Sequence, residues 1–448
     1  MGRSLPSIDV GGGYPICFIT PLIWRVFDYR CLEFHTASYA TISTAMHLKH
    51  LSLTNFRNFI RLETDFAAGS TILVGGNGQG KTSLLEAIHY LTGAASFHTA
   101  SDRHLINFLA LEEPIPFARL VAEIESQERI QRIEIRILIE SNSQSSEGRV
   151  RKEVLVNGLK RRMRELASSF TAVLFLPQDL KIIEGAPGNR RRFLDSSLAQ
   201  ADPTYAAALS EYQKVLTQRN ALLKKSQEGR SPLDQLTFWD EQLCDLAASL
   251  IRGRALALRE LDQLAAPLHS KLTRNKETLR LDYQPSFDPA PQPGGQLGLP
   301  IDTVLDRTGI SREEIRKGML DALERNRSDE IARGVTLQGP HRDDFRPRSN
   351  GIDLRLYGSR GQNRTAMLAM KLAEIEWLKQ RTGDWPILLL DEVLAELDLE
   401  RREDLLSHIS SVTQSILTTA DLSMFTEPFQ DQATIWKIEA GTITPRSD

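Results

Sequence analysis

Apolar residues define six short strands in the first part of the chain, either by alternating with polar residues or as brief buried runs. These strands are predicted at residues 47–54, 71–74, 120–124, 133–139, 153–156 and 173–177. Three of them follow one another closely, and the third ends at Asn157-Gly158, a frequent hairpin turn. An antiparallel sheet is therefore expected there. Residues 83–92 carry apolar side chains at helical spacing, which predicts a helix directly after the strand at 71–74.

The pattern changes from strands to helices at Gly188. Residues 190–275 are rich in Leu, Ala, Arg, Lys, Glu and Gln and contain almost no proline, which predicts long helices. Their apolar spacing does not settle into sustained heptads, so a long coiled coil is not expected. A loop rich in proline and glycine follows at 285–300, and helical spacing returns at 311–326.

Strands and helices alternate again after Gly334. The expected strands lie at 352–356, 386–390, 415–418 and 434–438, and the expected helices at 361–380 and 400–410. Alternation at both ends with helices between them predicts one α/β domain that is split by an insertion. The expected parts are an N-terminal extension (1–45), an α/β head (46–185 and 331–448) and a mainly helical arm (186–330).

The first 45 residues hold no patterned strand. Their best apolar stretch, Ile16–Trp24, is broken by Pro21, so it is too short for a membrane helix and makes a weak signal peptide. Met46 stands directly before the first patterned strand. Residues 1–45 are therefore expected to be a poorly ordered extension, or to precede the real start at Met46.

Charge and cysteine content limit the possible function classes. The 448 residues include 55 Lys and Arg against 58 Asp and Glu, a formal net charge of −3. This balance excludes a uniformly basic surface, so any contact with nucleic acid must come from a local patch. Three cysteines without a CxxC pair cannot build a disulfide framework, which indicates a soluble protein of a reducing compartment.

Residues 75–82 match the phosphate-binding loop GxxxxGK[ST] and lie between a predicted strand and a predicted helix, as that loop requires. Glycines let successive backbone N–H groups curl around phosphate oxygens, and the helix start adds a positive dipole end. Lys81 is expected to reach the β- and γ-phosphates, and the Thr82 hydroxyl to hold Mg²⁺. The predicted ATP-binding residues are Gly75, Gly76, Asn77, Gly78, Gln79, Gly80, Lys81 and Thr82.

A buried strand with two acids at its end supplies the partner motif. It runs from Ile387 to Asp391 and is followed by Glu392. Asp391 is predicted to bind Mg²⁺ and Glu392 to polarise the attacking water, with Lys81 as the second catalytic residue. Gln178 is a further candidate ligand of Mg²⁺ or water; the alternative is a plain turn at the end of a strand.

The segment Ser359-Arg360-Gly361-Gln362 opens a predicted helix between these two nucleotide motifs. Serine and glycine can offer hydroxyl and N–H groups to a phosphate, yet the loop at 75–82 already surrounds the triphosphate. A second phosphate-binding helix start is best explained if it serves the nucleotide of another subunit. Taken alone, the segment is equally a loop with a helix cap.

Eight motifs, in order, closely resemble those of the bacterial RecF family, the ABC/SMC-type ATPases of recombinational repair. The resemblance covers about residues 46–445 and includes Asp398 as the D-loop aspartate. The motifs are Asn-Phe-Arg-Asn at 55–58, the phosphate loop, Pro-Gln-Asp at 177–179, Arg-Arg-Arg-Phe-Leu-Asp at 190–195, Gln-Arg-Asn at 218–220, Gly-Pro-His-Arg-Asp-Asp at 339–344, Ser-Arg-Gly-Gln at 359–362 and Asp-Glu-Val-Leu-Ala-Glu-Leu-Asp at 391–398.

This resemblance implies an α/β, ABC-type P-loop ATPase head, made of a mixed sheet and an antiparallel lobe, with an inserted helical arm. It implies ATP and Mg²⁺ as cofactors, contacts of Arg57 and Asn58 with ATP, and an ATP-dependent homodimer with weak, DNA-stimulated ATPase activity. It also implies binding to gapped DNA or to junctions of single- and double-stranded DNA. RecR and RecO are the implied partners in loading recombinase, in the cytoplasm at the nucleoid and without a membrane.

Three other functions stay open. A transporter ATPase subunit is disfavoured by the long insertion and by residues 418–421, which hold no histidine where transporter ATPases carry a switch histidine. An SMC-like chromosome-structuring ATPase is disfavoured because the insertion is short and lacks heptads. A DNA-binding scaffold with a vestigial ATPase is disfavoured by the intact Lys81, Asp391 and Glu392.

Basic residues cluster at 149–164, beside the predicted hairpin turn. Seven Lys and Arg stand there against one acid, Glu153, and such a run can neutralise DNA phosphates whatever the base sequence. A solvated charged face is the alternative. The candidate DNA-binding residues are Arg149, Arg151, Lys152, Lys160, Arg161, Arg162 and Arg164.

Several other groups have competing interpretations. The basic run 190–192 could contact DNA, pair with acids or anchor the arm. Residues 341–344 could contact the nucleotide, but a buried ion-pair network between arm and head is favoured. Core packing is expected rather than base stacking or thiol chemistry for Trp239, Trp377, Trp385 and Cys244.

Overall fold

The computed structural model describes residues 46–445 apart from 94–95, 100, 127–128, 143–144, 167–169, 229–233 and 289–304. The predictions for residues 1–45 therefore lie outside the described residues, as does most of the expected loop at 285–300. Among the helices described, none combines the length and the apolar character that crossing a membrane requires.

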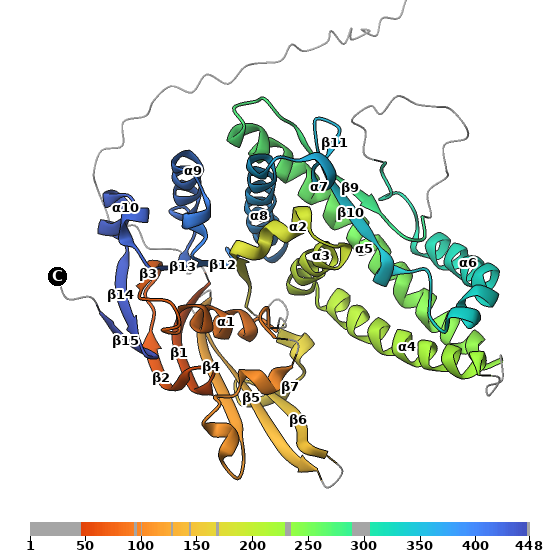
Figure 1. Ribbon diagram of the computed structural model, residues 1–448, viewed down its shortest axis with the longest axis horizontal. Helices are drawn as coiled ribbons and strands as arrows, with labels where there is room; N and C mark the ends of the chain where they lie inside the picture. The colour runs from red at the N-terminus through yellow and green to blue at the C-terminus, as the bar shows by residue number, and fades with distance from the viewer. Residues whose placement is uncertain are drawn as a thin grey trace, which may run out of the picture. The chain divides into compact units, whose positions relative to one another are not determined.

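Six strands form an antiparallel sheet in the order β2-β1-β4-β5-β6-β7 (Figure 1). The turn between β6 and β7 falls at Asn157-Gly158, where both residues have the positive φ that this hairpin turn requires. The predicted antiparallel sheet is confirmed. Its strands are β1 (His47–Phe56), β2 (Phe59–Asp65), β4 (Phe117–Ser126), β5 (Arg129–Asn142), β6 (Ser145–Val156) and β7 (Leu159–Arg161).

A second six-stranded sheet has the order β15-β14-β3-β13-β12-β8 and is parallel except for β15, which pairs antiparallel with β14. The mixed sheet is therefore confirmed. Because parallel strands end at the same edge of a sheet, the segments that follow β3, β12 and β8 meet there. The strands are β3 (Gly69–Val74), β8 (Ala172–Phe175), β12 (Ile387–Asp391), β13 (Gln414–Thr419), β14 (Thr434–Glu439) and β15 (Thr442–Pro445).

Alternate residues of this mixed sheet belong to two different cores. Ile72, Leu388 and Leu390 pack with the helices, whereas Leu73 and Leu389 pack with the antiparallel sheet and with α1 (Lys81–Leu91). Successive side chains of a strand point to opposite faces, so a strand buried on both faces reads as a continuous apolar run. Helix α1 lies beside β1 and β4 in Figure 1, directly after β3.

Helices of the head and of the arm pack in one continuous core with the mixed sheet. The long helices expected at 190–275, 311–326, 361–380 and 400–410 are confirmed. They are α3 (Pro187–Ala201), α4 (Pro203–Gln227), α5 (Asp234–Leu272), α6 (Arg312–Arg333), α8 (Arg360–Thr382) and α9 (Leu399–Ile409); the short helices are α2 (Lys181–Glu184), α7 (Leu354–Tyr357) and α10 (Glu427–Gln432).

A third sheet, in the order β11-β10-β9, was not predicted as such. β9 (Leu279–Gln284), from the expected arm, pairs with β10 (Asp344–Ser349), from the expected head. The expected strand at 352–356 is wrong beyond β11 (Ile352–Asp353), because the Asp353 carboxylate accepts a hydrogen bond from the Arg355 N–H at 3.0 Å and starts the helical turn α7. The boundaries between head and arm stay a prediction.

Buried arginines join the arm to the residues that follow it. The Arg190 guanidinium donates to both oxygens of Asp344, at 2.6 and 3.0 Å. Arg254 donates to Asp343 at 3.0 Å and to Asp195 at 2.9 Å. The interpretation of 341–344 as a buried ion-pair network is confirmed, and Arg190 anchors α3 within that network.

The partly buried His341 and the buried Cys244, near this network, have shifted pKa values. Burial lowers the pKa of His341 to about 4, and its Nδ1 lies 2.7 Å from the Tyr212 hydroxyl. Burial raises the pKa of the Cys244 thiol to about 12. Cys244 and Trp377 lie in the core while Trp239 and Trp385 pack against it, which confirms their predicted packing roles.

Arg219 on α4 is expected to be critical for stability. It donates to Asp240 and to Glu330, both at 2.6 Å, and all three side chains are buried. Arg219→Ala therefore leaves the buried Glu330 carboxylate without its counter-charge, while Asp240 keeps its pair with Arg327 at 2.8 Å. The free energy of unfolding should fall by about 3–5 kcal/mol in urea titrations. Lys214→Ala, which breaks an exposed pair with Glu211 on the same helix, should cost less than about 1 kcal/mol. If both variants lost the same free energy of unfolding, the buried ion pairs would not stabilise the fold more than the exposed one.

Candidate ATP-binding site

The phosphate loop joins the end of β3 to the start of α1. Gly80, the residue before α1, has a φ of +115°, and a Cβ on Gly75 would lie 2.4 Å from the Ile438 carbonyl oxygen. Glycine is therefore required at both positions, one for its conformation and one for close packing. The Lys81 ammonium donates to the carbonyl oxygens of Gly75 and Gly76, at 2.7 and 2.9 Å, so it crosses the mouth of the loop.

Two neighbouring turns hold this loop from outside. Asn58 Nδ2 donates to the Gln79 carbonyl oxygen at 3.1 Å, from the turn between β1 and β2. The Ala440 N–H donates to Gln79 Oε1 at 2.7 Å, and the Gly441 N–H donates to the Gln79 carbonyl at 3.1 Å, from the turn between β14 and β15. Asn58 and Gln79 thus support the loop backbone, while the contact from Ala440 had no signal in the sequence.

Asp391 and Thr82 face each other across the site. The Thr82 hydroxyl lies 2.8 and 3.0 Å from the two oxygens of the Asp391 carboxylate. The Thr418 hydroxyl donates to the same carboxylate at 2.8 Å, and Thr418 lies opposite Asp391 in the pairing of β13 with β12. Thr418 was missed as a site residue; its signal is a polar residue at the end of an otherwise apolar strand.

Glu392 has a left-handed backbone, with a φ of +53°, and its N–H donates to the Thr418 hydroxyl at 3.1 Å. Its carboxylate lies 2.9 Å from the Lys81 ammonium, whose side chain is only 4% exposed. The predicted water-polarising residue is therefore paired with the predicted phosphate-binding lysine. Together the loop and the two acids surround a cavity of about 250 Å³, lined by Asn77, Gly78, Gly80, Lys81, Thr82, Ser83, Pro177, Asp391 and Glu392.

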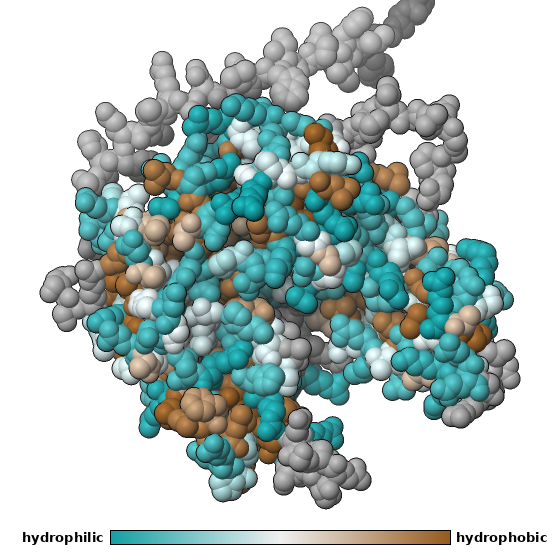
Figure 2. All heavy atoms as spheres, viewed as in Figure 1, coloured by the Kyte–Doolittle hydropathy of each residue, from teal (hydrophilic) through white to brown (hydrophobic). Residues whose placement is uncertain are grey.

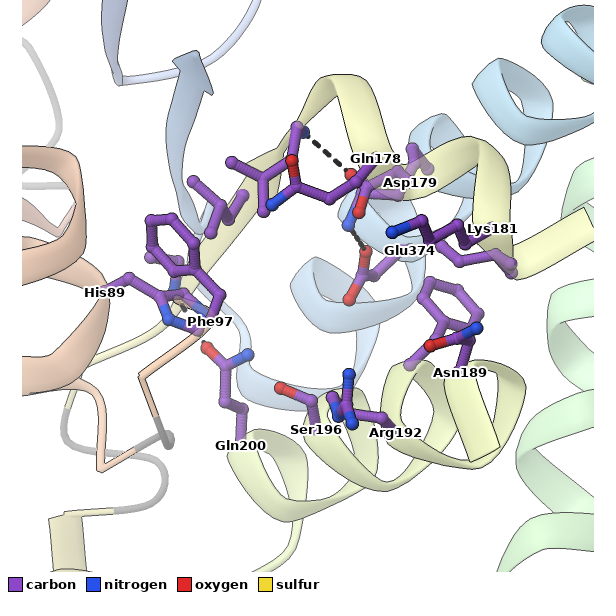
Figure 3. A pocket seen from close by; sticks show the side chains of 16 residues that line it. His89, Phe97, Gln178, Asp179, Lys181, Asn189, Arg192, Ser196, Gln200 and Glu374 are labelled. Atoms are coloured by element: carbon purple, nitrogen blue, oxygen red, sulfur yellow. Dashed lines mark hydrogen bonds and ion pairs between the residues drawn. The ribbon is translucent and has the colours of Figure 1, made fainter. Parts of the chain in front are cut away.

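Gln178 lies in the wall of a different cavity. This second cavity, of about 310 Å³, lies between β8, α3 and α8, and Figure 3 shows Gln178 at its upper edge beside Asp179. Burial raises the pKa of the Asp179 carboxyl to about 6. Only its neighbour Pro177 reaches the cavity of the phosphate loop. The role of Gln178 as a ligand of Mg²⁺ or water stays a prediction.

Arg57 is engaged with a buried acid of α1. Its guanidinium donates twice to the Glu86 carboxylate, at 2.7 and 2.8 Å, and once to the His104 carbonyl at 3.0 Å. Arg57 does not line the cavity of the phosphate loop. Its contact with ATP stays a prediction that requires the side chain to leave Glu86.

The segment Ser359–Gln362 does not line that cavity either. Ser359 caps α8: its hydroxyl accepts from the Gln362 N–H at 3.2 Å, and its own N–H donates to Gln362 Oε1 at 3.0 Å. Ser359, Arg360 and Gly361 are exposed. Within one subunit, the segment predicted to bind a second phosphate therefore lies apart from the phosphate loop, and its role stays a prediction.

Asp398 lies six residues after Glu392 and caps the start of α9. Its carboxylate accepts from the Arg401 N–H at 3.0 Å, and this hydrogen bond lowers the pKa of Asp398. Arg401 in turn donates to the Thr365 hydroxyl of α8 at 2.7 Å. The start of α9 is thus tied to the first turns of α8.

The basic cluster divides into paired and unpaired side chains. Arg151 pairs with Glu140, Lys152 with Asp102, and Lys160 lies 3.8 Å from Glu153. Within the described part of the chain, no ion pair involves the exposed side chains of Arg149, Arg161 and Arg162. The side chain of Arg164 lies outside those that the structure describes.

The sequence matches the family model of the RecF/RecN/SMC N terminal domain over residues 47–444. The chain belongs to the RecF/RecN/SMC family. It is 39% identical over 414 residues to the DNA replication and repair protein RecF of Roseiflexus castenholzii, covering 89% of this chain and 100% of that relative. It is 38% identical over 403 residues to the protein of the same name from Shouchella clausii, covering 89% and 99% of the two chains.

Solved structures of RecF share the fold. The recombination mediator protein RecF in the RecFOR pathway, with ATP, superposes with a TM-score of 0.74 and 30% identity, over 90% of this chain and 100% of that chain. The corresponding structure with ATPrS has a TM-score of 0.75 and 30% identity, over 90% and 99%. The resemblance to RecF and the predicted ABC-type head with a helical insertion are confirmed.

Lys81→Ala is expected to abolish ATP binding without unfolding the protein. The substitution removes the ammonium that lies beside the loop. With it go the charge-assisted hydrogen bonds expected with the phosphate oxygens, about two of about 1.5 kcal/mol each. Isothermal titration should show an affinity for ATP that is at least about a hundredfold weaker. Lys437→Ala, at an exposed lysine of β14, is the control. Unchanged ATP affinity with a normal circular dichroism spectrum would refute the assignment.

Proposed function

We propose that this protein is an ATP-driven recombination mediator that closes as a homodimer around two ATP molecules on gapped DNA. One observation carries the proposal: the phosphate loop, Asp391 and Glu392 form a single cavity, whereas the phosphate-binding helix start at Ser359 lies exposed elsewhere. Relatives that carry the name DNA replication and repair protein RecF support the assignment to repair. RecO- and RecR-type proteins are the proposed partners, as in the RecFOR pathway of the structural relatives.

Thr82 and Asp391 are suited to hold Mg²⁺ once ATP is bound. A hydroxyl and a carboxylate within 3.0 Å of each other present the hard oxygen ligands that Mg²⁺ prefers. No group of three or more His, Cys, Asp and Glu among the described residues forms a metal site by itself, so phosphate oxygens and water would complete the coordination. When bound, the ion would neutralise charge on the β- and γ-phosphates.

Lys81 and Glu392 would exchange partners when ATP enters. The triphosphate competes with Glu392 for the Lys81 ammonium, because the two side chains now pair at 2.9 Å. Glu392, once released, is placed beside Asp391 to accept a proton from the attacking water, while Lys81 stabilises charge on the γ-phosphate. The Glu392 N–H donates to the Thr418 hydroxyl, and this bond fixes the backbone of Glu392 at the end of β12. We infer a weak ATPase that DNA stimulates.

The surface around Ser359 supports a dimer. Leu356 and Tyr357 on α7 are 64% and 76% exposed, and Leu399 after Asp398 is 72% exposed. Figure 2 shows hydrophobic side chains over the region of β11 and α7, next to the start of α8. Large apolar side chains beside a phosphate-binding helix start are suited to contact a second subunit. A partner's Ser359 segment would then complete each ATP site.

A chromosome-structuring role fits the arm less well. α5, the longest described arm helix, has 39 residues, and residues of α3 to α6 share one core with the mixed sheet rather than extending as a coiled coil. A scaffold with a vestigial ATPase fits the site less well, because Lys81, Thr82, Asp391 and Glu392 are all in place.

The composite site predicts opposite effects for two substitutions. Ser359→Arg puts a long side chain where a partner's γ-phosphate would lie, so this variant should bind ATP with unchanged affinity and stay monomeric. Glu392→Gln keeps the shape of the site but removes the charge that activates water, so this variant should accumulate as an ATP-bound dimer. Light scattering with ATP distinguishes the two. Lys214→Ala, at an exposed residue of α4 away from the proposed dimer surface, is the control. A normal dimer of Ser359→Arg would overturn the composite site.

The basic cluster predicts a difference between its unpaired and its paired members. Replacing Arg149, Arg161 and Arg162 by Ala should weaken DNA binding and flatten the dependence of log affinity on log salt, by about one unit for each DNA phosphate that the variant no longer neutralises. Replacing Arg151, Lys152 and Lys160 by Ala should change this slope less, because their charge is already neutralised by Glu140, Asp102 and Glu153. Equal slopes for both triple variants and the unaltered protein would move the DNA surface elsewhere.

A further inference from the structure

The turn that ends α5, called here the arm turn (residues 273–278), contacts the start of α8. Glu277 in this turn uses both of its carboxylate oxygens. Oε1 accepts from Gln362 Nε2 at 3.1 Å, and Oε2 accepts from the Ser349 hydroxyl at 2.7 Å. A charged acceptor strengthens both hydrogen bonds, so the arm turn holds the side chain of Gln362 at a defined place.

Gln362 passes this constraint to Ser359. The Gln362 amide donates through Nε2 to Glu277 and accepts through Oε1 from the Ser359 N–H at 3.0 Å. An amide engaged at both ends has only one orientation that satisfies both partners. The Ser359 hydroxyl then accepts from the Gln362 N–H at 3.2 Å. Hydrogen bonds through the Gln362 side chain therefore connect the arm turn to the backbone of Ser359, whose hydroxyl is the proposed phosphate ligand.

Hydrogen bonds within the arm turn and with the turn after β10 hold the arm turn in place. The Glu277 N–H donates to the Thr273 hydroxyl at 3.3 Å, and the Thr278 N–H donates to Asn350 Oδ1 at 2.9 Å. β9 begins one residue later and pairs with β10. Because α5 and β9 enclose the turn, a displacement of the arm must displace the Glu277 carboxylate.

A second contact of the arm turn reaches the start of α9. Arg274 Nε donates to Glu400 Oε1 at 2.8 Å, two residues after Asp398. The arm turn thus contacts both segments proposed to face the partner subunit, one at Ser359 and one at Asp398. Arm residues also bond elsewhere to the residues that follow the arm, as Arg190 does to Asp344 and Ser197 to Glu374, but those contacts do not include Ser359 or Gln362.

We propose that Glu277 is a positioning residue that links the arm to the partner subunit's ATP. With the arm in its present place, Glu277 holds Gln362 and Ser359 ready for a γ-phosphate bound by the phosphate loop of the partner. Displacement of the arm by DNA or by a bound protein would release Gln362 and free the start of α8. This inference rests on the proposed composite site and adds to it the regulation of that site by the arm.

Glu277→Ala tests the inference against its conservative counterpart. The variant should keep the melting temperature and the ATP affinity of the monomer, while ATP-dependent dimerisation becomes about ten- to a hundredfold weaker, since one charge-assisted hydrogen bond is removed at each of two sites. Glu277→Gln retains an acceptor for Gln362 and should recover most of the dimer. Lys276→Ala, an exposed neighbour in the same turn, should dimerise normally. Unchanged dimerisation of Glu277→Ala, or no recovery in Glu277→Gln, would overturn the role.

Mixed subunits show on which ATP molecule Glu277 acts. Glu277→Ala keeps its own phosphate loop, and Lys81→Ala keeps its own Ser359 segment, so a mixed pair contains one intact composite site. ATP turnover should therefore exceed that of either variant alone. If Glu277 acted on the ATP of its own subunit, the mixed pair would contain no intact site and no gain would appear, which would overturn the inference.

A parallel mixture separates this inference from the proposed function. Ser359→Arg mixed with Lys81→Ala should also regain turnover, because it too leaves one intact composite site. If that mixture regains turnover and the Glu277→Ala mixture does not, the composite site stands and the role of Glu277 falls. If neither mixture regains turnover, the composite site itself is wrong.

Discussion

The site depends on the parallel pairing of β12 with β13 and of β13 with β3. In this register Asp391 lies opposite Thr418, and Thr418 lies opposite Leu73, one residue before the end of β3. The carboxylate thus arrives beside the first turn of α1, where Thr82 meets it. A slip of one residue in β12 would turn Asp391 to the opposite face of the sheet and bring a leucine to the site. Because β12 is apolar on both faces, its leucines fit either register; the hydrogen bonds of Asp391 with Thr82 and Thr418 select the one observed.

Motifs with a local mechanism were predictable from the sequence. The phosphate loop and the acids after β12 depend on residues that are adjacent in the chain, and the structure brings them into one cavity. Contacts between distant segments had no comparable signal. β9 does alternate apolar and polar residues from Leu279 to Gln284, so its strand signal was present and was missed. Pro347 stands inside β10, and the pairing of β10 with β9 depends on tertiary packing. Thr418 and Glu277 likewise had no signal, because their partners, Asp391 and Gln362, are distant in the sequence.

Charged residues were the hardest to interpret from the sequence alone. Arg57 belongs to a motif that resembles an ATP contact, but its guanidinium lies on Glu86. Arg190 belongs to a basic run of the kind that contacts DNA, yet it is buried against Asp344. The distinction depends on whether an acid from a distant segment lies within reach, because a buried arginine is stable only when it is paired. Local sequence does not contain that information.

The contact between Lys81 and Glu392 has a consequence for ligand selectivity. The chain supplies its own anion for the phosphate-binding lysine, so every incoming ligand competes with an internal carboxylate. A ligand with a single, well-hydrated negative charge gains little by replacing Glu392, because it exchanges one ion pair for another. A polyphosphate brings several charges to one place and also engages the backbone N–H groups of the loop. We therefore expect Lys81 to favour ligands of high charge density, and the return of Glu392 to Lys81 to assist the release of product.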